Sequence, residues 1–496
     1  MVISLNPITK KSHEIPGVLD DSENIIDFLK KNKGKKVVVV QGLGFVGAVM
    51  SLVCANAITE EYVVIGVDQA NQNSYWKIDC INNGIFPLVA DDPKIDEFFE
   101  KTKEKGNFYA TYDSLAYQYA DIVIVDINLD VEKNSNDDAE LEDFSVNLDD
   151  FKQAIKSIGN NCQDDVLILV ETTVPPGTCE LIVKPIIEDE LSNRNLPTNK
   201  YKLGHSYERV MPGPDYINSI REYPRVYSGI TEESADAIEC FLKTIIDTDS
   251  CNLTRLGDTN ATEIAKVLEN SYRAMNIAFA VEWSRYAEES GVDLYSIINA
   301  IRVRKTHSNL MYPGIGVGGY CLTKDPLLAS WSRKSFFGSK SDLSMSVNSV
   351  SINDQMPKYA FERLVQVFGK LRNKRVTFLG VSYRGDVGDT RFSPAELMVK
   401  MVKNAGSQIK LHDPFVSFWQ ERNCTVETEL KKVLELSSDI IIISSGHSEY
   451  RSETTIGLLM SINPLKIFDT IGLFDEDQLS ALRSRHQVSV LGRGDI

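Results

Sequence analysis

The sequence predicts an α/β protein with two Rossmann-like, doubly wound domains that are joined by a long central helix. Short β-branched runs alternate with helical stretches in the first half of the chain and again after Lys374. The length of 496 residues exceeds that of one ordinary domain. Between the two α/β regions, residues 260–301 have helical periodicity without a proline.

These patterns divide the chain into four predicted parts. Residues 1–34 form an N-terminal extension with a short leading helix, and residues 35–255 form the first domain. Residues 256–340 form a central helical region, and residues 341–496 form the second domain. The acidic stretch 130–150 is predicted to be a surface loop.

A glycine-rich loop joins a predicted strand (35–40) to a helix. Its sequence is Gly42-Leu43-Gly44-Phe45-Val46-Gly47. The next strand (62–67) ends at Asp68. In this pattern the first glycine makes the turn, the second admits a pyrophosphate and the third lets the helix pack on the strand, while the helix N-terminus attracts phosphate. We therefore predict dinucleotide binding, with NAD preferred over NADP because Asp68 would repel a 2′-phosphate.

A second glycine-rich segment places a cysteine beside a Lys–Asp pair. It reads Gly316-Val317-Gly318-Gly319-Tyr320-Cys321-Leu322-Thr323-Lys324-Asp325. A thiol becomes a nucleophile where cations or aligned N–H dipoles favour its thiolate. The carboxylate of Asp325 is a candidate base for a water molecule. The alternative interpretation is that Cys321 is a small buried residue in a turn.

Two further pairs carry candidate polar groups. On the predicted central helix, Lys266 and Asn270 are four residues apart and share a face. The alternative for both is ordinary solvent exposure. In the second α/β region, Arg384 and Arg391 lie in a loop between a strand (375–379) and a helix, which suits a phosphate ligand.

Composition excludes several classes of function. The net charge of −17 argues against broad nucleic-acid binding. The eight cysteines and six histidines form no C-x-x-C or H-E-x-x-H motif, so we predict no metal site. Scattered thiols and the lack of an apolar signal region predict a cytoplasmic protein. Residues 37–58 are uncharged and long enough to span a bilayer, but their glycines indicate a strand, a turn and a helix, so we predict no membrane span.

Together these segments resemble the UDP-glucose/GDP-mannose dehydrogenase family of nucleotide-sugar 6-dehydrogenases, over about residues 35–496. Three more segments match family motifs: Glu171-Thr172-Thr173-Val174-Pro175-Pro176-Gly177-Thr178, Tyr207-Glu208-Arg209-Val210-Met211-Pro212-Gly213 and Gly388-Asp389-Thr390-Arg391-Phe392-Ser393-Pro394. The second resembles P-E-R-V-x-P-G of members that act on UDP-N-acetylhexosamines, with Tyr207 in place of proline. A V-P-T-P-like segment of the family is replaced here by Val125-Asp126-Ile127-Asn128-Leu129.

The resemblance implies a four-electron oxidation of the C6 hydroxyl of a UDP-sugar to a uronic acid, with two NAD per turnover, for polysaccharide or cell-surface glycan synthesis. In that reaction Cys321 forms a thiohemiacetal and then a thioester, and Asp325 activates the hydrolytic water. Lys266 and Asn270 hold the oxyanion. Thr173 and Glu208 help to place water and relay protons.

The resemblance also implies binding residues and assembly. The expected cofactor contacts are Gly42, Gly44, Phe45, Val46, Gly47, Asp68, Thr173 and Lys324. The expected substrate contacts are Arg209, Val210, Lys266, Asn270, Lys305, Tyr312, Gly318 and Arg391. Lys305, or Arg304 beside it, matches a position that reaches the substrate across a dimer interface, so we expect a homodimer or a larger even-numbered oligomer.

Other functions remain open at this point. A UDP-glucose 6-dehydrogenase would use the same reaction on another sugar. A two-electron β-hydroxyacid-type dehydrogenase shares the first domain and the K-x-x-x-N helix but needs neither Cys321 nor the second α/β domain. A non-catalytic nucleotide-binding protein would retain only the fold. A thiol acyltransferase would use Cys321 but would leave Asp68 unexplained.

Overall fold

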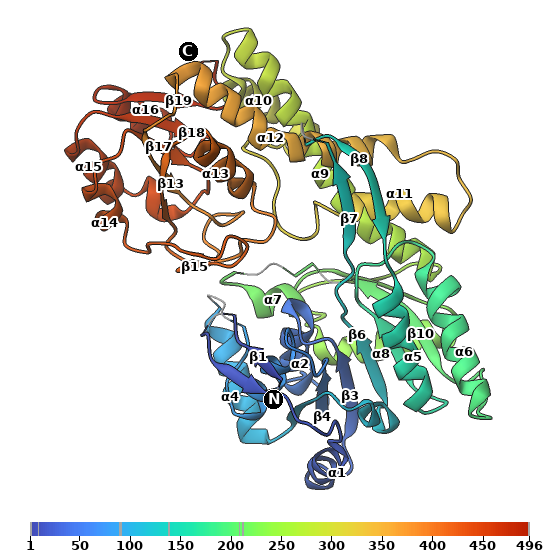
Figure 1. Cartoon of the computed structure of the whole chain (residues 1–496). Coiled ribbons are helices and arrows are strands. Elements are labelled where there is room, and N and C mark those ends of the chain that lie inside the picture. The colour runs from blue at the N-terminus through green and yellow to red at the C-terminus, as the bar shows by residue number, and fades with distance from the viewer. Residues whose placement is uncertain are drawn as a thin grey trace. The chain divides into compact units, whose positions relative to one another are not determined.

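The computed structural model describes residues 2–7, 9–88, 92–136, 139–207, 209–210 and 213–494. The chain divides by its contacts into two compact units (Figure 1). The first contains residues 1–130, 146–267 and 331–338, and the second contains residues 131–145, 268–330 and 339–496. The α/β class with two Rossmann-like sheets is confirmed, whereas the predicted four-part division stays a prediction.

The first unit is built on an eight-stranded sheet with the order β12-β11-β10-β9-β6-β3-β4-β5. All neighbours are parallel except β10 and β11. The strands are β3 (Lys36–Gln41), β4 (Tyr62–Val67), β5 (Phe108–Thr111), β6 (Ile122–Val125), β9 (Leu167–Val170), β10 (Lys202–Tyr207), β11 (Arg225–Gly229) and β12 (Leu253–Arg255). The order reverses at β3, so a ligand is expected at the carboxyl ends of β3 and β6.

Helices cover this sheet because its central strands are apolar on both faces. The run Val37–Val40 is buried, and its residues Val38 and Val40 pack in one core with Val49, Val53 and Leu242 of the covering helices. The helices are α2 (Phe45–Ala55), α3 (Tyr75–Asn82), α4 (Pro93–Lys105), α5 (Asp149–Asn161), α6 (Lys184–Asn193), α7 (Tyr216–Arg221) and α8 (Glu232–Ile245).

The N-terminal extension contains more structure than the predicted short helix. That helix, α1 (Ser22–Lys31), is present and contacts β5. Before it, β1 (Ile3–Leu5) and β2 (Ser12–Glu14) form an antiparallel hairpin that contacts α3. The hairpin was not predicted because its apolar residues are few and mostly point outward.

The central helical stretch is two helices, where the sequence predicted one. Helix α9 spans Thr259–Glu289 and α10 spans Leu294–Arg302. Gly291 separates them with a φ of +69°, a conformation that favours glycine and ends a helix. Asp293 then begins α10 by accepting the N–H of Tyr295. Helices α11 (Asp325–Ser335) and α12 (Ser344–Phe368) follow.

The described part of the acidic stretch 130–150 lies largely at the surface, as predicted, but the prediction of a loop was wrong. Strands β7 (Val131–Ser135) and β8 (Leu141–Val146) form a two-stranded sheet that is anchored on α12. Lys133 Nζ lies 2.6 Å from Asp354 Oδ2, and the N–H of Leu141 donates to Ser351 Oγ. The acidic composition gives no strand signal here, and the contacts of the sheet with α12 join residues more than 200 positions apart.

The second unit carries a five-stranded parallel sheet with the order β14-β13-β17-β18-β19. The strands are β13 (Arg375–Leu379), β14 (Gln408–His412), β17 (Ile440–Ile443), β18 (Lys466–Asp469) and β19 (Gln487–Val490). Helices α13 (Pro394–Asn404), α14 (Leu430–Glu435), α15 (Glu453–Ser461) and α16 (Glu476–Arg483) accompany it. Its strand order reverses at β13, so a ligand is expected near the loop that follows this strand.

Two further features, membrane-spanning helices and metal-binding clusters, were searched for among the described residues. None of their helices combines the length and the apolar composition that crossing a membrane requires. In the same part of the chain, the acidic, histidine and cysteine side chains form no group of three or more that could hold a metal ion.

A buried carboxylate ties the start of α9 to the turn after β9. Glu263 is 1% exposed, and it accepts the backbone N–H groups of Gly177 at 2.6 Å and Cys179 at 2.9 Å. Burial raises the pKa of Glu263 to about 7. The folded protein therefore binds this proton more tightly than the unfolded chain does.

The free energy of unfolding should depend on whether Glu263 is protonated. Glu263 contributes stability fully below its unfolded pKa of 4.5, and the contribution is lost as pH rises through about 7. The stability of the wild type relative to Glu263→Gln should fall by about 3 kcal/mol between pH 5 and 8. Urea denaturation across that range measures it, with the exposed Glu289→Gln on the same helix as control. A pH-independent gap would contradict the assignment.

Candidate active site

The first glycine-rich loop has the geometry that a bound pyrophosphate requires. Gly42 has a φ of +99°, and a Cβ there would lie 2.2 Å from the carbonyl oxygen of Asp126. A Cβ on Gly47 would lie 1.9 Å from the carbonyl oxygen of Gly42. Around Gly44 no atom lies within 4 Å of the Cβ position, so the approach to the N-terminus of α2 is open. These residues fit a dinucleotide.

Asp68 follows β4 directly and is already engaged by the protein. Its Oδ2 accepts the N–H of Leu43 at 3.1 Å and lies 2.7 Å from Lys77 Nζ on α3. Its Oδ1 accepts the N–H of Gln69. The ammonium of Lys77 offsets part of the charge of Asp68, so this edge repels a 2′-phosphate less than an isolated carboxylate would. Sequence reasoning missed Lys77, because nothing in the sequence shows which helix residue faces Asp68.

The segment after β9 is joined to the unusual loop after β6. Thr172 Oγ1 accepts the N–H of Ile127 at 2.8 Å and donates to the carbonyl oxygen of Val125 at 3.1 Å. Thr173, the predicted catalytic threonine, is half-buried at the carboxyl end of β9. The loop therefore has a defined conformation without the V-P-T-P sequence.

Helix α9 presents Lys266 and Asn270 on one face, and both are buried. The alternative of ordinary solvent exposure is therefore wrong for both residues. The ammonium of Lys266 lies 5.4 Å from the centre of the Tyr207 ring, a favourable cation–π geometry. Burial and the nearby charge of Lys266 lower the pKa of His205 to about 3, which keeps this histidine neutral. Tyr207, which replaces the family proline, thus contacts the predicted catalytic lysine.

Cys321 is exposed, which excludes the interpretation of a buried turn residue. Its carbonyl oxygen accepts the N–H groups of Lys324 and Asp325, so the thiol precedes α11 by a tight turn. The glycines before it are required by close contacts within the second unit. A Cβ on Gly318 would lie 2.4 Å from Tyr383 Cβ, and Gly319 has a φ of +77°. The Cβ side of Gly318 therefore faces protein; its predicted substrate contact stays a prediction.

Asp325 is the centre of a buried polar cluster. It is 0% exposed, its Oδ2 accepts Asn270 Nδ2 at 2.6 Å, and its Oδ1 accepts Lys324 Nζ at 2.7 Å. The Lys324 ammonium also lies 4.6 Å from the centre of the Tyr320 ring. This geometry orients Asn270 and Lys324 directly. The predicted role of Asp325 as a base requires a water molecule to reach an already occupied carboxylate.

Arg391 lies in the loop after β13 and is held next to the cysteine segment. Its guanidinium pairs with Asp389, with Nη2 2.6 Å from Oδ2. Its carbonyl oxygen accepts the N–H of Gly319 at 2.9 Å. The loop that carries the predicted nucleotide-binding arginine therefore contacts the segment that carries Cys321.

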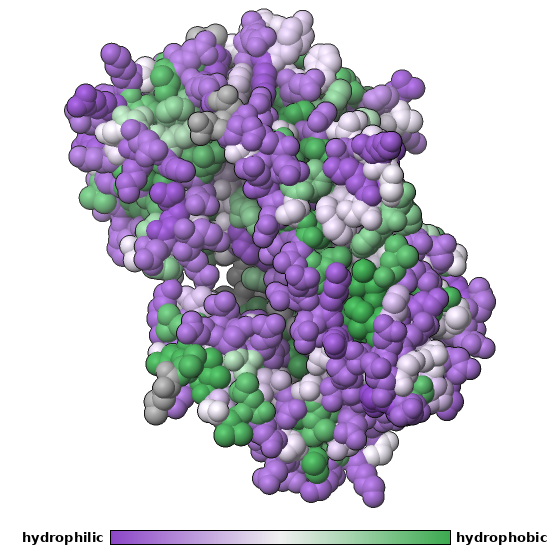
Figure 2. Space-filling model, turned by 45° about the vertical axis from the view of Figure 1, so that its right-hand side comes forward, coloured by the Kyte–Doolittle hydropathy of each residue, from purple (hydrophilic) through white to green (hydrophobic). Residues whose placement is uncertain are grey.

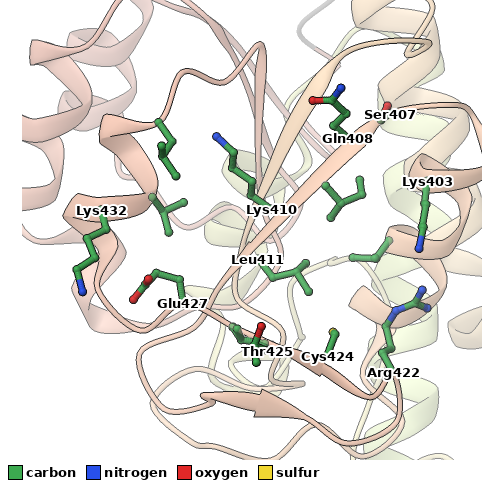
Figure 3. A pocket seen from close by; sticks show the side chains of 15 residues that line it. Lys403, Ser407, Gln408, Lys410, Leu411, Arg422, Cys424, Thr425, Glu427 and Lys432 are labelled. Atoms are coloured by element: carbon green, nitrogen blue, oxygen red, sulfur yellow. The ribbon is translucent and has the colours of Figure 1, made fainter.

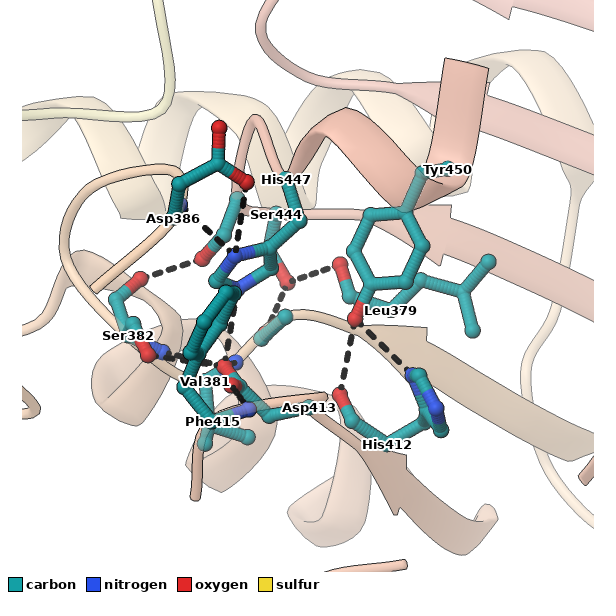
Figure 4. Close-up of polar contacts among 12 residues, drawn as sticks. Leu379, Val381, Ser382, Asp386, His412, Asp413, Phe415, Ser444, His447 and Tyr450 are labelled. Carbon is teal, nitrogen blue, oxygen red and sulfur yellow. Dashed lines mark hydrogen bonds and ion pairs between the residues drawn. The ribbon is translucent and has the colours of Figure 1, made fainter. Parts of the chain in front are cut away.

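A buried Asp–His pair fixes the start of the same loop, as Figure 4 shows. Asp413 Oδ2 accepts the N–H groups of Val381 and Ser382 and lies 3.0 Å from His447 Nε2. His447 Nδ1 in turn accepts the N–H of Asp386 at 2.9 Å. Three strands, β13, β14 and β17, thus contribute to one rigid loop base at their carboxyl ends.

The remaining predicted substrate residues have varied surroundings. Arg209 donates to the carbonyl oxygen of Pro224. Val210 packs against the hydrophobic core of the first unit. Tyr312 stacks on Tyr295 at 5.7 Å, and Lys305 is exposed in a 3₁₀ turn. Their roles stay predictions. Glu208, with Met211 and Pro212 of the same motif, lies outside the described residues.

A pocket of about 660 Å³ lies in the second unit at the edge strand β14 (Figure 3). Its lining includes Lys403, Lys410, Arg422 and Cys424. None of the predicted catalytic or binding residues lines it. It is therefore distinct from the candidate active site.

Three family models match the chain in order. The NAD-binding domain of the UDP-glucose/GDP-mannose dehydrogenase family matches residues 35–245. The central domain of that family matches residues 260–354, and its UDP-binding domain matches residues 377–476. The three matches include both glycine-rich loops, the helix pair and Arg391.

Individual proteins agree with these matches. A UDP-N-acetyl-D-mannosamine dehydrogenase of Pyrococcus horikoshii is 28% identical over 92% of this chain and 100% of its own length. One from Methanocaldococcus jannaschii is 31% identical over 69% of this chain and 74% of its own. The solved UDP-D-ManNAc dehydrogenase from P. horikoshii has a TM-score of 0.75 at 26% identity, covering 93% of this chain and 100% of that one. The chain belongs to the UDP-glucose/GDP-mannose dehydrogenase family.

Proposed function

We propose that this protein oxidises the C6 hydroxyl of a UDP-N-acetylhexosamine to the carboxylate through a covalent intermediate on Cys321. The NAD-dependent nucleotide-sugar dehydrogenase class follows from the family. The observation that carries the proposal is the exposed thiol of Cys321 beside the buried Asn270–Asp325–Lys324 cluster. A two-electron dehydrogenase has no use for this arrangement.

The glycine-rich loop would hold the oxidant for both oxidation steps. NAD, when bound at the glycine-rich loop, accepts one hydride in each of them. Gly42, Gly44 and Gly47 shape the loop that approaches the pyrophosphate, and Phe45 and Val46 begin the helix behind it. Asp68, already paired with Lys77, orients the adenosine ribose. Thr173 and Lys324 complete the proposed cofactor contacts.

The chemistry of the sugar rests on groups of this chain. After the first oxidation the thiolate of Cys321 adds to the aldehyde carbon, and the oxygen becomes a tetrahedral oxyanion. Lys266 and Asn270 stabilise that oxyanion, because two buried donors on one helix face need no reorganisation. The second oxidation leaves a thioester. Water then releases the carboxylate and returns the thiol, with Asp325, Thr173 and Glu208 in the proton transfers.

The nucleotide half of the substrate is proposed to bind the loop after β13. Arg391 is held there by Asp389, and Lys305, Tyr312 and the Gly318 backbone are further candidates. Arg209 and Val210 would contact the sugar side. The relatives named above act on UDP-N-acetyl-D-mannosamine, which favours an N-acetylhexosamine over glucose here.

A substrate panel tests the proposal. Purified protein with NAD should oxidise at least one of UDP-ManNAc, UDP-GlcNAc and UDP-GalNAc with a kcat/KM at least about tenfold above UDP-glucose and GDP-mannose, since a site built to hydrogen-bond the acetamido group rejects sugars without it. Two NADH should form per sugar. Preference for UDP-glucose would overturn the substrate assignment, and one NADH per sugar would indicate a two-electron enzyme.

The exposed face of α9 supports a homodimer or a larger even-numbered assembly. Apolar residues recur along it at intervals of three, four and seven, which keeps them on one face, and they are exposed to a large extent: Ile264, Leu268, Tyr272, Phe279, Trp283 and Tyr286. Such a stripe is typical of a helix with a partner surface. The space-filling view shows apolar residues gathered in patches on a mostly polar face (Figure 2). Ala278 of the same helix is 2% exposed, so it packs within the chain and does not belong to the stripe.

Two substitutions on α9 separate assembly from chemistry. Leu268→Asp places a charge in the stripe, so sedimentation should show dissociation or loss of folding. Lys266→Ala, two residues earlier and on the buried face, should keep the assembly and lower turnover about 100-fold or more, as a lost oxyanion donor does. A fully active wild-type monomer at assay concentration would refute the interface, and an active Lys266→Ala would refute the oxyanion role.

A further inference from the structure

The N-terminal hairpin lies outside the family models, which begin at residue 35. It is formed by β1, which Figure 1 labels, and β2, with Ser4 paired to His13 in register, and it contacts α3. Its side chains are arranged opposite to those of an ordinary amphipathic hairpin. Polar residues point inward, with Ser4 0% and His13 3% exposed, whereas Ile3 and Leu5 are about half exposed.

Ser4 caps α3 from outside that helix. The residue that begins α3, Ser74, makes no side-chain cap of its own. Instead the N–H of Trp76 donates to Ser4 Oγ at 3.1 Å, and Ser4 Oγ donates to the carbonyl oxygen of Gln72 at 2.8 Å. One buried hydroxyl therefore satisfies an N–H group of the first turn and holds the loop that precedes it.

A second contact fixes the middle of α3. His13 Nδ1 lies 2.7 Å from Asp79 Oδ2, and His13 Nε2 lies 3.9 Å from Cys80 Sγ. Asn6 Nδ2 also reaches Cys80 Sγ at 3.9 Å. The hairpin is thus joined to α3 at the first turn and again in the middle of the helix. Such directional contacts define position more than they add apolar burial.

Helix α3 carries Lys77 between these anchors. Lys77 Nζ pairs with Asp68 Oδ2, and the same oxygen accepts the N–H of Leu43 in the glycine-rich loop. Ser4 is therefore connected to the cofactor loop through Trp76, Lys77 and Asp68. A shift of α3 would move the ammonium away from Asp68 and would change the charge and orientation of the edge that meets the adenosine ribose.

We propose that the N-terminal hairpin is a cofactor-affinity element, in which Ser4 and His13 are positioning residues for the Lys77–Asp68 pair. This inference rests on the proposed cofactor site. It assigns to β1 and β2 a role in binding the adenosine half of NAD and none in the chemistry at the sugar. The effect of the hairpin should therefore appear in cofactor binding and not in the turnover of the saturated enzyme.

The test uses the full-length protein and measures direct binding. Ser4→Ala removes both hydrogen bonds, so the Kd for NADH and for ADP-ribose, from fluorescence and calorimetry, should rise about fivefold or more, the equivalent of a lost buried hydrogen bond. The kcat at saturating NAD and the KM for the UDP-sugar should stay within about twofold, since neither depends on the adenosine edge. Asp79→Ala, which breaks the second anchor on α3, should have the same selective effect.

Ser12→Ala is the matched control, because it makes the same change at an exposed position of the same hairpin. It should leave every parameter unchanged. If Ser4→Ala and Asp79→Ala both bind NADH as tightly as the wild type does, the positioning role is refuted while the proposed function stands. If both variants lose affinity for NADH and UDP-sugar alike, the hairpin is only a general stabiliser and the inference also fails. A wild type that binds no NADH would refute the cofactor site itself.

Discussion

The buried bond between Asn270 and Asp325 is the interaction on which the candidate active site depends. Asn270 belongs to α9, and Asp325 is the first residue of α11, just after the Cys321 turn. Because a buried carboxylate must be fully paired, Asp325 also binds Lys324. One side chain thus determines where α9 meets the cysteine segment. Asn270 shares its face of α9 with Lys266.

Each of the two sheets also carries a loop that buried polar groups or close backbone contacts hold at the carboxyl ends of its strands. In the first unit, the three glycines of the phosphate loop allow contacts that a Cβ would prevent, and Glu263 holds the turn after β9. In the second unit, Asp413 and His447 hold the start of the loop that carries Arg391. Sites built on such pre-organised loops lose little free energy to reorganisation when charge develops.

Much of the fold and several site groups could be predicted from the sequence, because their signals are local. The glycine spacing at 42, 44 and 47 and the interval between Lys266 and Asn270 each reflect one turn or one helix. The roles of Ser4 and of the β7–β8 sheet could not be predicted, because each depends on a partner far along the chain. Lys77 lies only nine residues from Asp68, but nothing in the sequence shows which residue of the helix faces that carboxylate. The single helix predicted for 260–301 was wrong for a related reason: the apolar periodicity continues past Gly291, whose left-handed conformation breaks the helix.

The central claim is that Cys321 carries the sugar through the second oxidation, and Cys321→Ser tests it most directly. A serine hydroxyl is a much weaker nucleophile than a thiolate, so the steady-state formation of NADH from the UDP-sugar should fall by about 100-fold or more. The Kd for NADH should remain that of the wild type, because the thiol is not part of the phosphate loop. Wild-type turnover with two NADH per sugar in this variant would contradict the account.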